Sequence, residues 1–457
     1  MVSRTNIRRY VERYMPIESV CQFLTLCSSL HPDDAFCMRE FNLGYQKADG
    51  SDGFSRFHQF RTAEELKQEL LRRAPCRVDA GGILATETVY MKLGIAWRDV
   101  QALEKEFVID IDVDDYRDVR ACGCTGKQLC QDCWAFLAVA AKIVDHLLRM
   151  KFGCSELLWV YSGRRGVHCW VLDRAAARFS VKYRRAIVDY LSPFNVMPDH
   201  RAYTGSCKVV SALYTSTIVH EFETLLETRA LRFGSAPMNA YVMKIALSGH
   251  TNTLLTRDLV TAARPDMSNI AIWNRYKIAL RKHHPESERV IMNIVLSLVF
   301  PRIDAAVSID PKHLVKCPFS WHPRTGAICI PFDVHSAREF SLDDVPNISS
   351  FSNFAGFEKW LVLLDITLLD LSPTAQKYVC LDCVDSRMPL RDIPRYIVFN
   401  EPDEWVAHYA EHDHGNTETL ENSRLSELVR RMCTAHPQSE RTRLKKVFYD
   451  QLTSKFP

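Results

Sequence analysis

Apolar and polar residues alternate along this chain with two periods, and the change of period separates predicted helices from predicted strands. Residues 134–152 (WAFLAVAAKIVDHLLRMKF) place apolar side chains at helical spacing without a glycine or proline, which predicts one long helix. Residues 157–173 (LLWVYSGRRGVHCWVLD) form two apolar runs around a turn bracketed by Gly163 and Gly166, which predicts a strand, a tight turn and a second strand. Strands that alternate with helices predict an α/β core.

Other stretches extend this pattern toward both ends of the chain. Residues 1–75 are predicted to be helical segments joined by a polar loop, and residues 76–113 to be short strands that end in EFVIDIDV. Residues from about 175 to 297 are predicted to be mostly helical. A β-like stretch follows at 301–333, with a hairpin turn at 324–326 (RTG).

This order of segments predicts an α/β (α+β) fold in which a discontinuous mixed sheet is flanked by helices. The predicted parts are a discontinuous core, a small cysteine-bearing loop within it, a helical insertion subdomain and a C-terminal extension of unknown role, at residues 1–174 with 298–365, 122–133, 175–297 and 366–457. The extension has seven acidic and no Lys or Arg side chains at 401–421, and then eight basic and three acidic ones at 422–457. We expect it to bind a partner or to be specific to this lineage.

Composition narrows the class of protein. Of 457 residues, 47% are hydrophobic and 25% are charged, which is typical of globular chains and excludes disordered, collagen-like and coiled-coil classes. The 58 basic and 55 acidic residues give a net charge of +3, so a nucleic-acid partner would need a local basic site. The longest apolar run, near 290–300, is too short to span a bilayer. The arginine-containing start also lacks the apolar segment of a secretory signal, so we expect a soluble protein without a membrane partner, in a reducing compartment.

Two aspartates on one predicted strand carry the first chemical motif. In FVIDIDV, strand geometry places Asp110 and Asp112 on one face, and Ile109, Ile111 and Val113 on the other, toward the core. Two close carboxylates repel each other unless a cation lies between them, and Mg²⁺ and Mn²⁺ prefer such oxygen ligands. A solvated strand end that runs into a turn is the alternative.

The turn inside residues 157–173 carries the second motif. A serine, two arginines and a histidine lie in or beside the Gly-bracketed turn, at Ser162, Arg164, Arg165 and His168. These side chains can present several donors to one point, and guanidinium groups pair bidentately with phosphate oxygens. The stretch is not a Walker loop, because G-x-x-x-x-G-K-[ST] is absent. A basic surface hairpin is the alternative.

A cluster of cysteines carries the third motif. Four of the sixteen cysteines fall within a dozen residues, at Cys122, Cys124, Cys130 and Cys133. Their spacing can close a tetrahedral thiolate site around one structural Zn²⁺. An iron–sulfur cluster and chance clustering of free thiols are the alternatives. Further along, the CLDC sequence at 380–383 and the histidines after it could form a second metal site.

Polar residues of the β-like stretch at 301–333 indicate a functional site only in combination with these motifs. Asp304 can supply a third carboxylate, and Lys316, Ser320 and His322 can supply further phosphate ligands. Three carboxylates for two metal ions, together with a cationic cluster for a triphosphate, are what nucleotidyl transfer requires.

Three long stretches then indicate a known family: FVIDIDVDDYRDVRAC, LWVYSGRRGVHCWVLD and PRIDAAVS with HLVKCPFSWHPRTG. Weaker matches are RRYVERYMP, MREFNL, SRFHQF and RVDAGGIL, and together they span roughly residues 8–365. In these stretches the chain resembles the small catalytic subunit of eukaryotic-type DNA primase, of the archaeo-eukaryotic primase superfamily. Nothing after about residue 366 takes part in the resemblance.

The resemblance implies roles for the motif residues. Asp110, Asp112 and Asp304 would hold two catalytic Mg²⁺ or Mn²⁺ ions. The residues implied to grip the triphosphate of the incoming ribonucleotide are Ser162, Arg164, Arg165, His168, Lys316 and His322.

Three further positions and the zinc motif follow from the same resemblance. Asp79 would lie near the ribose and Arg56 would line the site, while Arg77 stands where the family usually has lysine. The zinc ligands match in order, but the first two cysteines are adjacent in the family and here Gly123 separates them. We therefore expect a slightly reshaped zinc site.

The implied activity is template-directed synthesis of short RNA primers from ribonucleoside triphosphates on single-stranded DNA. The implied partners are a large regulatory primase subunit, in a heterodimer, and the replicative DNA polymerase alpha complex that extends the primer, in the nucleus. Two alternatives remain: a primase-polymerase of the same superfamily that acts in damage tolerance, and a non-catalytic zinc-bearing assembly subunit. The intact Asp110, Asp112, Asp304 and Arg165 argue against the second alternative.

Overall fold

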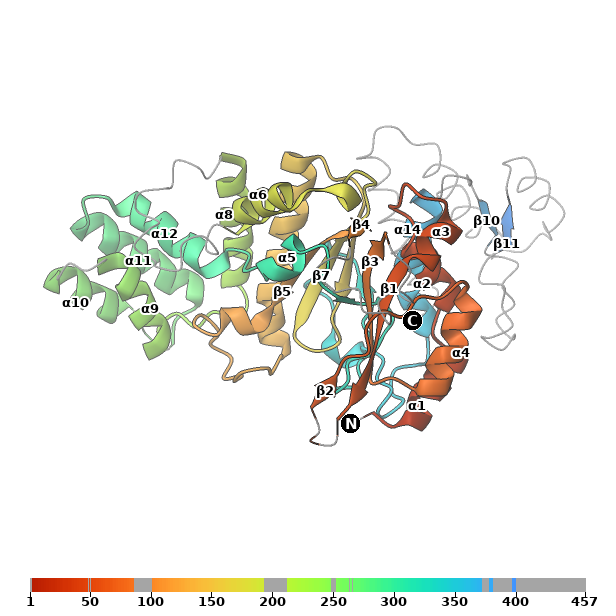
Figure 1. Cartoon of the computed structure of the whole chain (residues 1–457). Helices are drawn as coiled ribbons and strands as arrows, with labels where there is room; N and C mark the ends of the chain where they lie inside the picture. The colour runs from red at the N-terminus through yellow and green to blue at the C-terminus, as the bar shows by residue number, and fades with distance from the viewer. Residues whose placement is uncertain are drawn as a thin grey trace, which may run out of the picture.

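The structure, a computed structural model, describes residues 2–47, 49, 51–85, 101–192, 212–247, 252–262, 264, 266–371, 378–380 and 397–399. The helices of these residues are α1 (Arg4–Arg13), α2 (Ile17–Phe23), α3 (Pro32–Cys37), α4 (Ala63–Arg73), α5 (Gln131–Phe152), α6 (Val181–Leu191), α8 (Ala212–Leu226), α9 (Ala236–Leu247), α10 (Thr253–Ala262), α11 (Asn269–His283), α12 (Ser287–Val299), α13 (Ala305–Ile309) and α14 (Val362–Leu371). Figure 1 shows α9 to α12 at one end of the molecule and α1 to α4 at the other, with two sheets between them.

The first sheet brings distant parts of the chain together. Its strand order is β2 (Asp52–Gly53), β1 (Arg39–Gln46), β3 (Arg77–Leu84) and β4 (Ala102–Glu104), and β8 (Val315–Lys316) also pairs with β3. The register sets Asp79 beside Asn42 on β1 and beside Lys316 on β8. A strand that follows residue 300 therefore lies against a strand from the first hundred residues.

The second sheet has the order β5 (Phe107–Asp112), β7 (Gly166–Val171), β6 (Leu157–Tyr161) and β9 (Pro331–Phe332). Helix α5 follows β5 in the chain and returns it to β6, so β7 lies between the two strands that α5 connects. The register pairs Asp110 on β5 with His168 on β7. This pairing places one residue of the aspartate motif opposite one residue of the motif at 162–168, the arginine turn.

Helix α5 forms the centre of the core beside this sheet. It contacts β5 and β7, and most of its residues are buried, because its apolar side chains continue around much of the helix. Trp134 stacks on Phe340 with 4.5 Å between the ring centroids, and its Nε1 donates to the carbonyl of Ala337 at 2.6 Å. Gly153 ends the helix at a φ of 67°.

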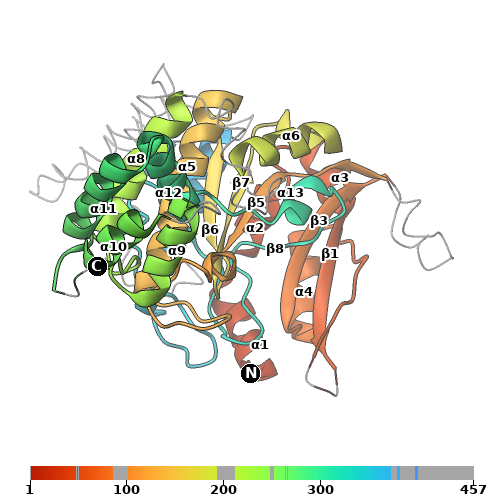
Figure 2. The ribbon, with the colours of Figure 1, turned by 90° about the vertical axis from the view of Figure 1, so that its left-hand side faces the viewer.

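Helices α8 to α12 pack on one another and meet the core through α8 and α12, which both contact α5 (Figure 2). The described residues between 212 and 299 are thus mainly helical, as the sequence predicts. The boundaries of the predicted domains stay a prediction.

The predicted α/β class, the helix at 134–152 and the two strands within 157–173 are confirmed. The sheet arrangement differs from the predicted mixed sheet, because the strands of the described residues form separate sheets whose pairings are antiparallel. In the second sheet the short β6–β7 turn imposes this, since a hairpin connects antiparallel strands.

Two segments differ from the predicted secondary structure. The sequence predicts helical segments for residues 1–75, but residues Arg39–Gln46 form strand β1. This strand buries the polar residues Arg39, Glu40 and Asn42, so its sequence shows no alternation of polar and apolar residues. The β-like stretch at 301–333 begins with the short helix α13, because the Asp304 side chain caps the Ala306 N–H at 3.0 Å.

The C-terminal extension and its possible second metal site fall mostly outside the described residues. Helix α14 packs on α2, β6 and β9, and the short strands β10 (Tyr378–Cys380) and β11 (Ile397–Phe399) pair with each other. Cys383 and residues 400–457 lie outside the described residues. Within the described part of the chain, no helix combines the length and apolar character needed to cross a membrane.

Candidate active site

Three carboxylates approach one another at the end of β5. Asp110 and Asp112 share a face of the strand, while Ile109 and Ile111 on the other face are completely buried. The backbone of Asp304 runs alongside, because its N–H donates to the carbonyl of Asp110 at 2.9 Å. The structure therefore brings the third predicted carboxylate to the first two from a distant part of the chain.

The electrostatics of this cluster show an excess of negative charge. Burial, the largest cause, and the nearby charges of Asp112 and Asp304 together raise the pKa of Asp110 to about 7, against an opposing effect of Lys316. Burial also raises the pKa of Asp112 and of Asp115. A cation among these oxygens would relieve the repulsion, so the donor set fits a divalent ion that prefers oxygen ligands.

The three carboxylates are nevertheless not drawn into a closed cage. In the described residues, the cysteine cluster is the group of potential ligands whose atoms all lie within 4.8 Å of one another, and the aspartates do not form such a group. Asp112 forms an ion pair with Arg165, and an oxygen of Asp304 caps α13. Mutual repulsion and these competing partners account for the wider spacing.

The Gly-bracketed turn lies directly beside the carboxylates. Gly163 adopts a φ of +79°, which an L side chain rarely adopts, and Gly166 N donates to Ser162 Oγ at 3.1 Å. The guanidinium of Arg165 contacts Asp112 and lies 3.7 Å from an oxygen of Asp114. The turn thus directs one arginine toward the aspartates. The other arginine, Arg164, lies near His322, because after burial and Lys316 its charge is the next cause that lowers the pKa of that histidine.

Two predicted phosphate ligands are neutral histidines. Burial is the main cause that lowers the pKa of His168 to about 3 and that of His322 to about 2, with Lys316 adding to both effects. Nδ1 of His322 accepts the N–H groups of Arg324 and Thr325, at 3.2 and 3.3 Å. Its Nε2 therefore carries the proton and is a donor.

Two buried nitrogens of the described site residues lack a hydrogen-bond partner. Within the described residues, Nδ1 of His168 and Nη1 of Arg165 are buried nitrogens without a hydrogen-bond partner. Nε2 of His168 lies 3.6 Å from Asp110. Buried polar atoms normally find partners, so these two nitrogens indicate a site that a polar ligand completes.

The first sheet supplies the opposite side of the site. Lys316 on β8 donates its Nζ to the carbonyl of Ser162 at 3.3 Å and so links the first sheet to the turn of the second. Asp79, next to Lys316 in register, is fully buried and accepts hydrogen bonds from Asn42 and Arg77, each at 2.7 Å. Asp79, the predicted ribose contact, and Lys316, one of the predicted phosphate contacts, are therefore on neighbouring strands.

Arg56 is held on this first sheet. Its guanidinium forms two hydrogen bonds to the buried Glu40, at 2.8 and 2.9 Å, and a third to the carbonyl of Lys312 at 3.1 Å. Glu40 and Asn42 are alternate residues of β1 and share a face, so Arg56 and Asp79 lie on the same side of the sheet.

Two residues of the site were not predicted. Asn42 holds Asp79, and Thr325 Oγ1 donates to the carbonyl of Gly163 at 2.7 Å, which ties the 322–327 loop to the arginine turn. Asn42 lies between Phe41 and Leu43, and nothing in the local sequence indicates that it contacts Asp79. Nothing in the local sequence marks Thr325, because its partner is far away in the chain.

Comparison with known proteins decides the family. The family model for the DNA primase small subunit matches residues 109–334. A DNA primase small subunit of Schizosaccharomyces pombe is 30% identical over 65% of this chain and 67% of its own length. One of Drosophila melanogaster is 29% identical over 74% of this chain and 79% of its own. The archaeal DNA primase small subunit PriS of Methanobrevibacter smithii is 24% identical over 64% and 82%.

The chain belongs to the DNA primase small subunit family. The match begins at Ile109 on β5 and ends at Val334, just after β9, so it includes both aspartates of β5, the arginine turn, Asp304 and Lys316. The carboxylates and the basic turn described above thus lie inside the part of the chain that defines this primase family.

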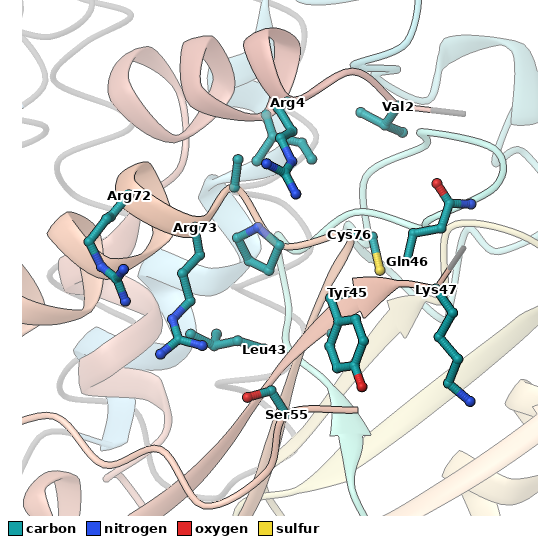
Figure 3. A pocket seen from close by; sticks show the side chains of 14 residues that line it. Val2, Arg4, Leu43, Tyr45, Gln46, Lys47, Ser55, Arg72, Arg73 and Cys76 are labelled. Atoms are coloured by element: carbon teal, nitrogen blue, oxygen red, sulfur yellow. The ribbon is translucent and has the colours of Figure 1, made fainter. Parts of the chain in front are cut away.

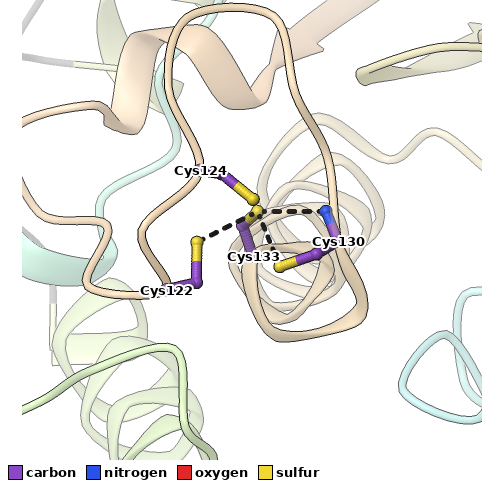
Figure 4. A group of neighbouring side chains, drawn as sticks. All are labelled: Cys122, Cys124, Cys130 and Cys133. Carbon is purple, nitrogen blue, oxygen red and sulfur yellow. Dashed lines mark hydrogen bonds between the residues drawn. The ribbon is translucent and has the colours of Figure 1, made fainter.

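The four clustered cysteines of this chain converge on one point (Figure 4). The sulfur of Cys133 lies 3.5 Å from that of Cys122 and 3.4 Å from that of Cys130. All four sulfurs lie within 4.8 Å of one another, and Cys130 and Cys133 are at the first turn of α5. This geometry fits a tetrahedral thiolate site for zinc, and Gly123, at a φ of +83°, turns the chain between the first two ligands.

A cavity of about 630 Å³ lies elsewhere on the molecule, between α1, the end of α4 and β1 (Figure 3). Four basic residues contribute to its lining, Arg4, Lys47, Arg72 and Arg73. Arg72 and Arg73 both pair with Glu69, which reduces the positive charge there. None of the predicted site residues lines this cavity, so it is separate from the carboxylate site.

Proposed function

We propose that this chain is the catalytic subunit of a DNA primase and synthesises short RNA primers from ribonucleoside triphosphates on single-stranded DNA. The observation that carries the proposal is the meeting of three carboxylates with a basic turn and with Lys316, which come from two sheets and from both sides of the helical insertion. The primase names of the relatives support the same activity.

In this proposal Asp110, Asp112 and Asp304 hold two Mg²⁺ or Mn²⁺ ions. When bound, such ions lower the pKa of the attacking 3′-hydroxyl and neutralise charge on the leaving pyrophosphate. The raised pKa of Asp110, caused by burial and by its two neighbours, supports a cation site at this place. Lys316 and Arg165 are cations that lie beside the carboxylates.

The triphosphate would lie along the arginine turn. Arg164, Arg165 and Lys316 supply positive charge, and Ser162, His168 and His322 supply hydrogen bonds. The two histidines bind as neutral donors, because burial lowers the pKa of each far below 7. Fixed donors in a partly buried site stabilise developing charge without reorganisation, which is the main catalytic contribution that this chain can make.

The first sheet would receive the nucleoside. Asp79 has both carboxylate oxygens held, by Asn42 and Arg77, so its position is fixed before the ribose arrives. Arg56 is fixed in the same way by Glu40. Holding these groups in place reduces the entropy lost when the substrate binds.

The proposal also includes a zinc ion, partner proteins and a cellular compartment. One structural Zn²⁺ would bind the four cysteines that follow β5 in the chain. The chain would work in a heterodimer with a large regulatory subunit and would hand its primer to the replicative DNA polymerase alpha complex, in the nucleus. The primase small-subunit family itself supports the existence of a larger partner.

The test is extension of a primed single-stranded DNA template by the purified chain, with ribonucleotides and Mg²⁺ or Mn²⁺. Asp110→Ala should abolish extension, whereas Asp33→Ala, which removes an exposed carboxylate of α3, should leave it unchanged. Equal extension by Asp110→Ala and the unmodified chain would overturn the proposal. A strong preference for deoxyribonucleotides would instead indicate a primase-polymerase.

A further inference from the structure

The three carboxylates depend on the relative placement of two separate elements. Asp110 and Asp112 are on β5, whereas Asp304 is the residue that caps α13. Helix α13 packs on β5 and on α6, and Figure 2 shows α6 and α13 side by side near β5. A group that holds α13 and the start of β5 at the same time would therefore fix the spacing of the carboxylates.

Arg184 on α6 is such a group. Its side chain is almost fully buried, at 1% exposure, and each of its five N–H groups points to a backbone carbonyl. The accepting carbonyls are those of Phe179 at 3.0 Å, Glu106 at 3.2 Å, Ser308 at 3.4 Å, Ala176 at 3.4 Å and Lys105.

The carbonyls that accept from Arg184 belong to separate segments of the chain. Lys105 and Glu106 form the link between β4 of the first sheet and β5 of the second, and Ser308 belongs to α13. The guanidinium also lies 5.5 Å from the ring centre of Phe107, the first residue of β5. One side chain thus holds the start of the strand with two carboxylates and the helix capped by the third.

The chemistry of the contact differs from that of a buried ion pair. In the described part of the chain no carboxylate lies within ion-pairing distance of Arg184, and the carboxylate of Glu106 pairs with Arg39 instead. The guanidinium therefore acts as a planar set of five donors. A lysine ammonium has three donors at one point and cannot reach carbonyls spread over three segments.

We infer that Arg184 is a positioning residue of the catalytic centre, which sets the distance between the aspartates of β5 and Asp304 and thereby the affinity for divalent ions. This inference rests on the proposed function. Residues that orient metal ligands without touching the metal typically change metal affinity by about 10- to 100-fold. Arg184 acts one step further away, through the backbone, so we expect the lower end of that range.

The test measures Mn²⁺ binding to the full-length chain by electron paramagnetic resonance of free Mn²⁺, with primer extension as a second readout. Arg184→Lys removes most of the carbonyl contacts, and it should weaken Mn²⁺ binding about 10-fold. The Mn²⁺ concentration for half-maximal extension should rise by the same factor, and saturating Mn²⁺ should restore most of the rate.

Arg149→Lys is the matched control. Arg149 is a partly buried arginine of α5 that bonds Asp145 and the carbonyl of Ser155, and it touches neither β5 nor α13. Its variant should lose thermal stability to a similar degree while its Mn²⁺ affinity stays unchanged. Arg184→Lys with unchanged Mn²⁺ affinity in a folded chain would overturn the inference.

Comparing the unmodified chain with Asp110→Ala distinguishes a failure of this inference from a failure of the proposed function. If the unmodified chain shows no Mn²⁺ binding that Asp110→Ala removes, the proposed function fails. If that binding is present and Arg184→Lys matches Arg149→Lys, only the positioning role of Arg184 fails. Circular dichroism of every variant confirms that the loss does not come from unfolding.

Discussion

Asp110 and His168 face each other across β5 and β7, and both are shifted toward their uncharged forms. Burial raises the pKa of Asp110 to about 7 and lowers that of His168 to about 3. Near neutral pH the pair therefore carries at most a partial negative charge when no metal is bound. Divalent ions would displace the proton from Asp110, so their affinity should increase as pH rises through 7.

The raised pKa of Asp110 predicts a stability effect without metal. The native state binds this proton more tightly than the unfolded chain, so in EDTA stability falls as pH rises from about 4 to 7 and stays low above it. Asp110→Asn removes the buried charge, and at pH 8 in EDTA it should stabilise the fold by about 1–3 kcal/mol, although extension is lost. Calorimetry at pH 8 and pH 5 checks this, because the gain should shrink at pH 5. An equal gain at both pH values would contradict the assignment.

Gly163 gives a second prediction at the residue scale. A Cβ there would lie 2.8 Å from the carbonyl oxygen of Ala327 and 3.1 Å from Cβ of His322, so Gly163→Ala must displace the turn or the 322–327 loop. We expect the KM for ribonucleotides to rise about 10-fold or more, since a displaced turn costs transition-state and ground-state contacts alike.

Gly153→Ala is the control for that variant. Gly153 has a similar φ of +67°, but a Cβ there would have no atom within 4 Å. It should lose about 1 kcal/mol of stability and keep its KM. Steady-state kinetics with thermal melts separates the two, and equal KM values for both variants would speak against a nucleotide site at the turn.

The sequence predicts residue properties that depend on near neighbours. Alternation along β5 was enough to place Asp110 and Asp112 on one face, and the glycines were enough to predict the turn. Contacts between residues that are distant in the sequence could not be predicted in this way. The bonds of Thr325 to the arginine turn and of Arg184 to β5 and α13 join segments whose separation no local pattern encodes.

At the scale of elements, the cysteine loop and α5 form one unit. Cys130 is the residue before the first turn of α5, Cys133 is within that turn, and Cys122 and Cys124 approach from the loop that follows β5. A bound ion would therefore fix the entry into α5 and, through α5, support the sheet that carries Asp110.

Replacing Cys130 and Cys133 together by serine should reduce the zinc content from about one ion per chain to none. Because thiolate ligation links the loop to α5, the thermal midpoint should fall by several degrees. Elemental analysis and thermal melts of the reduced protein measure both effects. Cys37→Ser, outside the cluster, is the control and should keep its zinc. Folded unmodified protein without zinc would refute the site.

The sequence predicts correctly whether a segment is a helix or a strand where its apolar residues follow a single period, as in α5 and in β6 with β7. It does not do so for β1 or for α13. Strand β1 buries an arginine and a glutamate, which form ion pairs with Glu106 and Arg56 that only the tertiary structure supplies. Helix α13 has five residues, so its cap outweighs the strand preference of its apolar residues.

At the scale of the whole molecule, two sheets meet at the site, and Lys316 and the link through Lys105 and Glu106 connect them. The predicted order of strand, helical and strand segments was enough to indicate a core built from both ends of the chain. The division into two antiparallel sheets was not predicted, because strand pairing between distant segments leaves no periodic trace in the sequence.

The position of α14 predicts where the chain can be shortened. Helix α14 packs on α2, β6 and β9, so it belongs to the core, whereas the site has no described contact with any later residue. Removing residues 373–457 should therefore leave extension of a primed template within about two-fold of the full chain. Circular dichroism and extension assays check this, and loss of activity in a folded, shortened chain would show that the extension takes part in catalysis.

The pairing of β3 with β8 has a consequence for how the protein is made. Asp304, Lys316 and His322 leave the ribosome long after Asp79 and Asp110, with the whole helical insertion synthesised in between. Until then β3 lacks one neighbour and the early aspartates lack their partners. If the site binds nucleotide as proposed, binding requires a chain that extends past His322, and chains released before that point would be unable to compete for substrate.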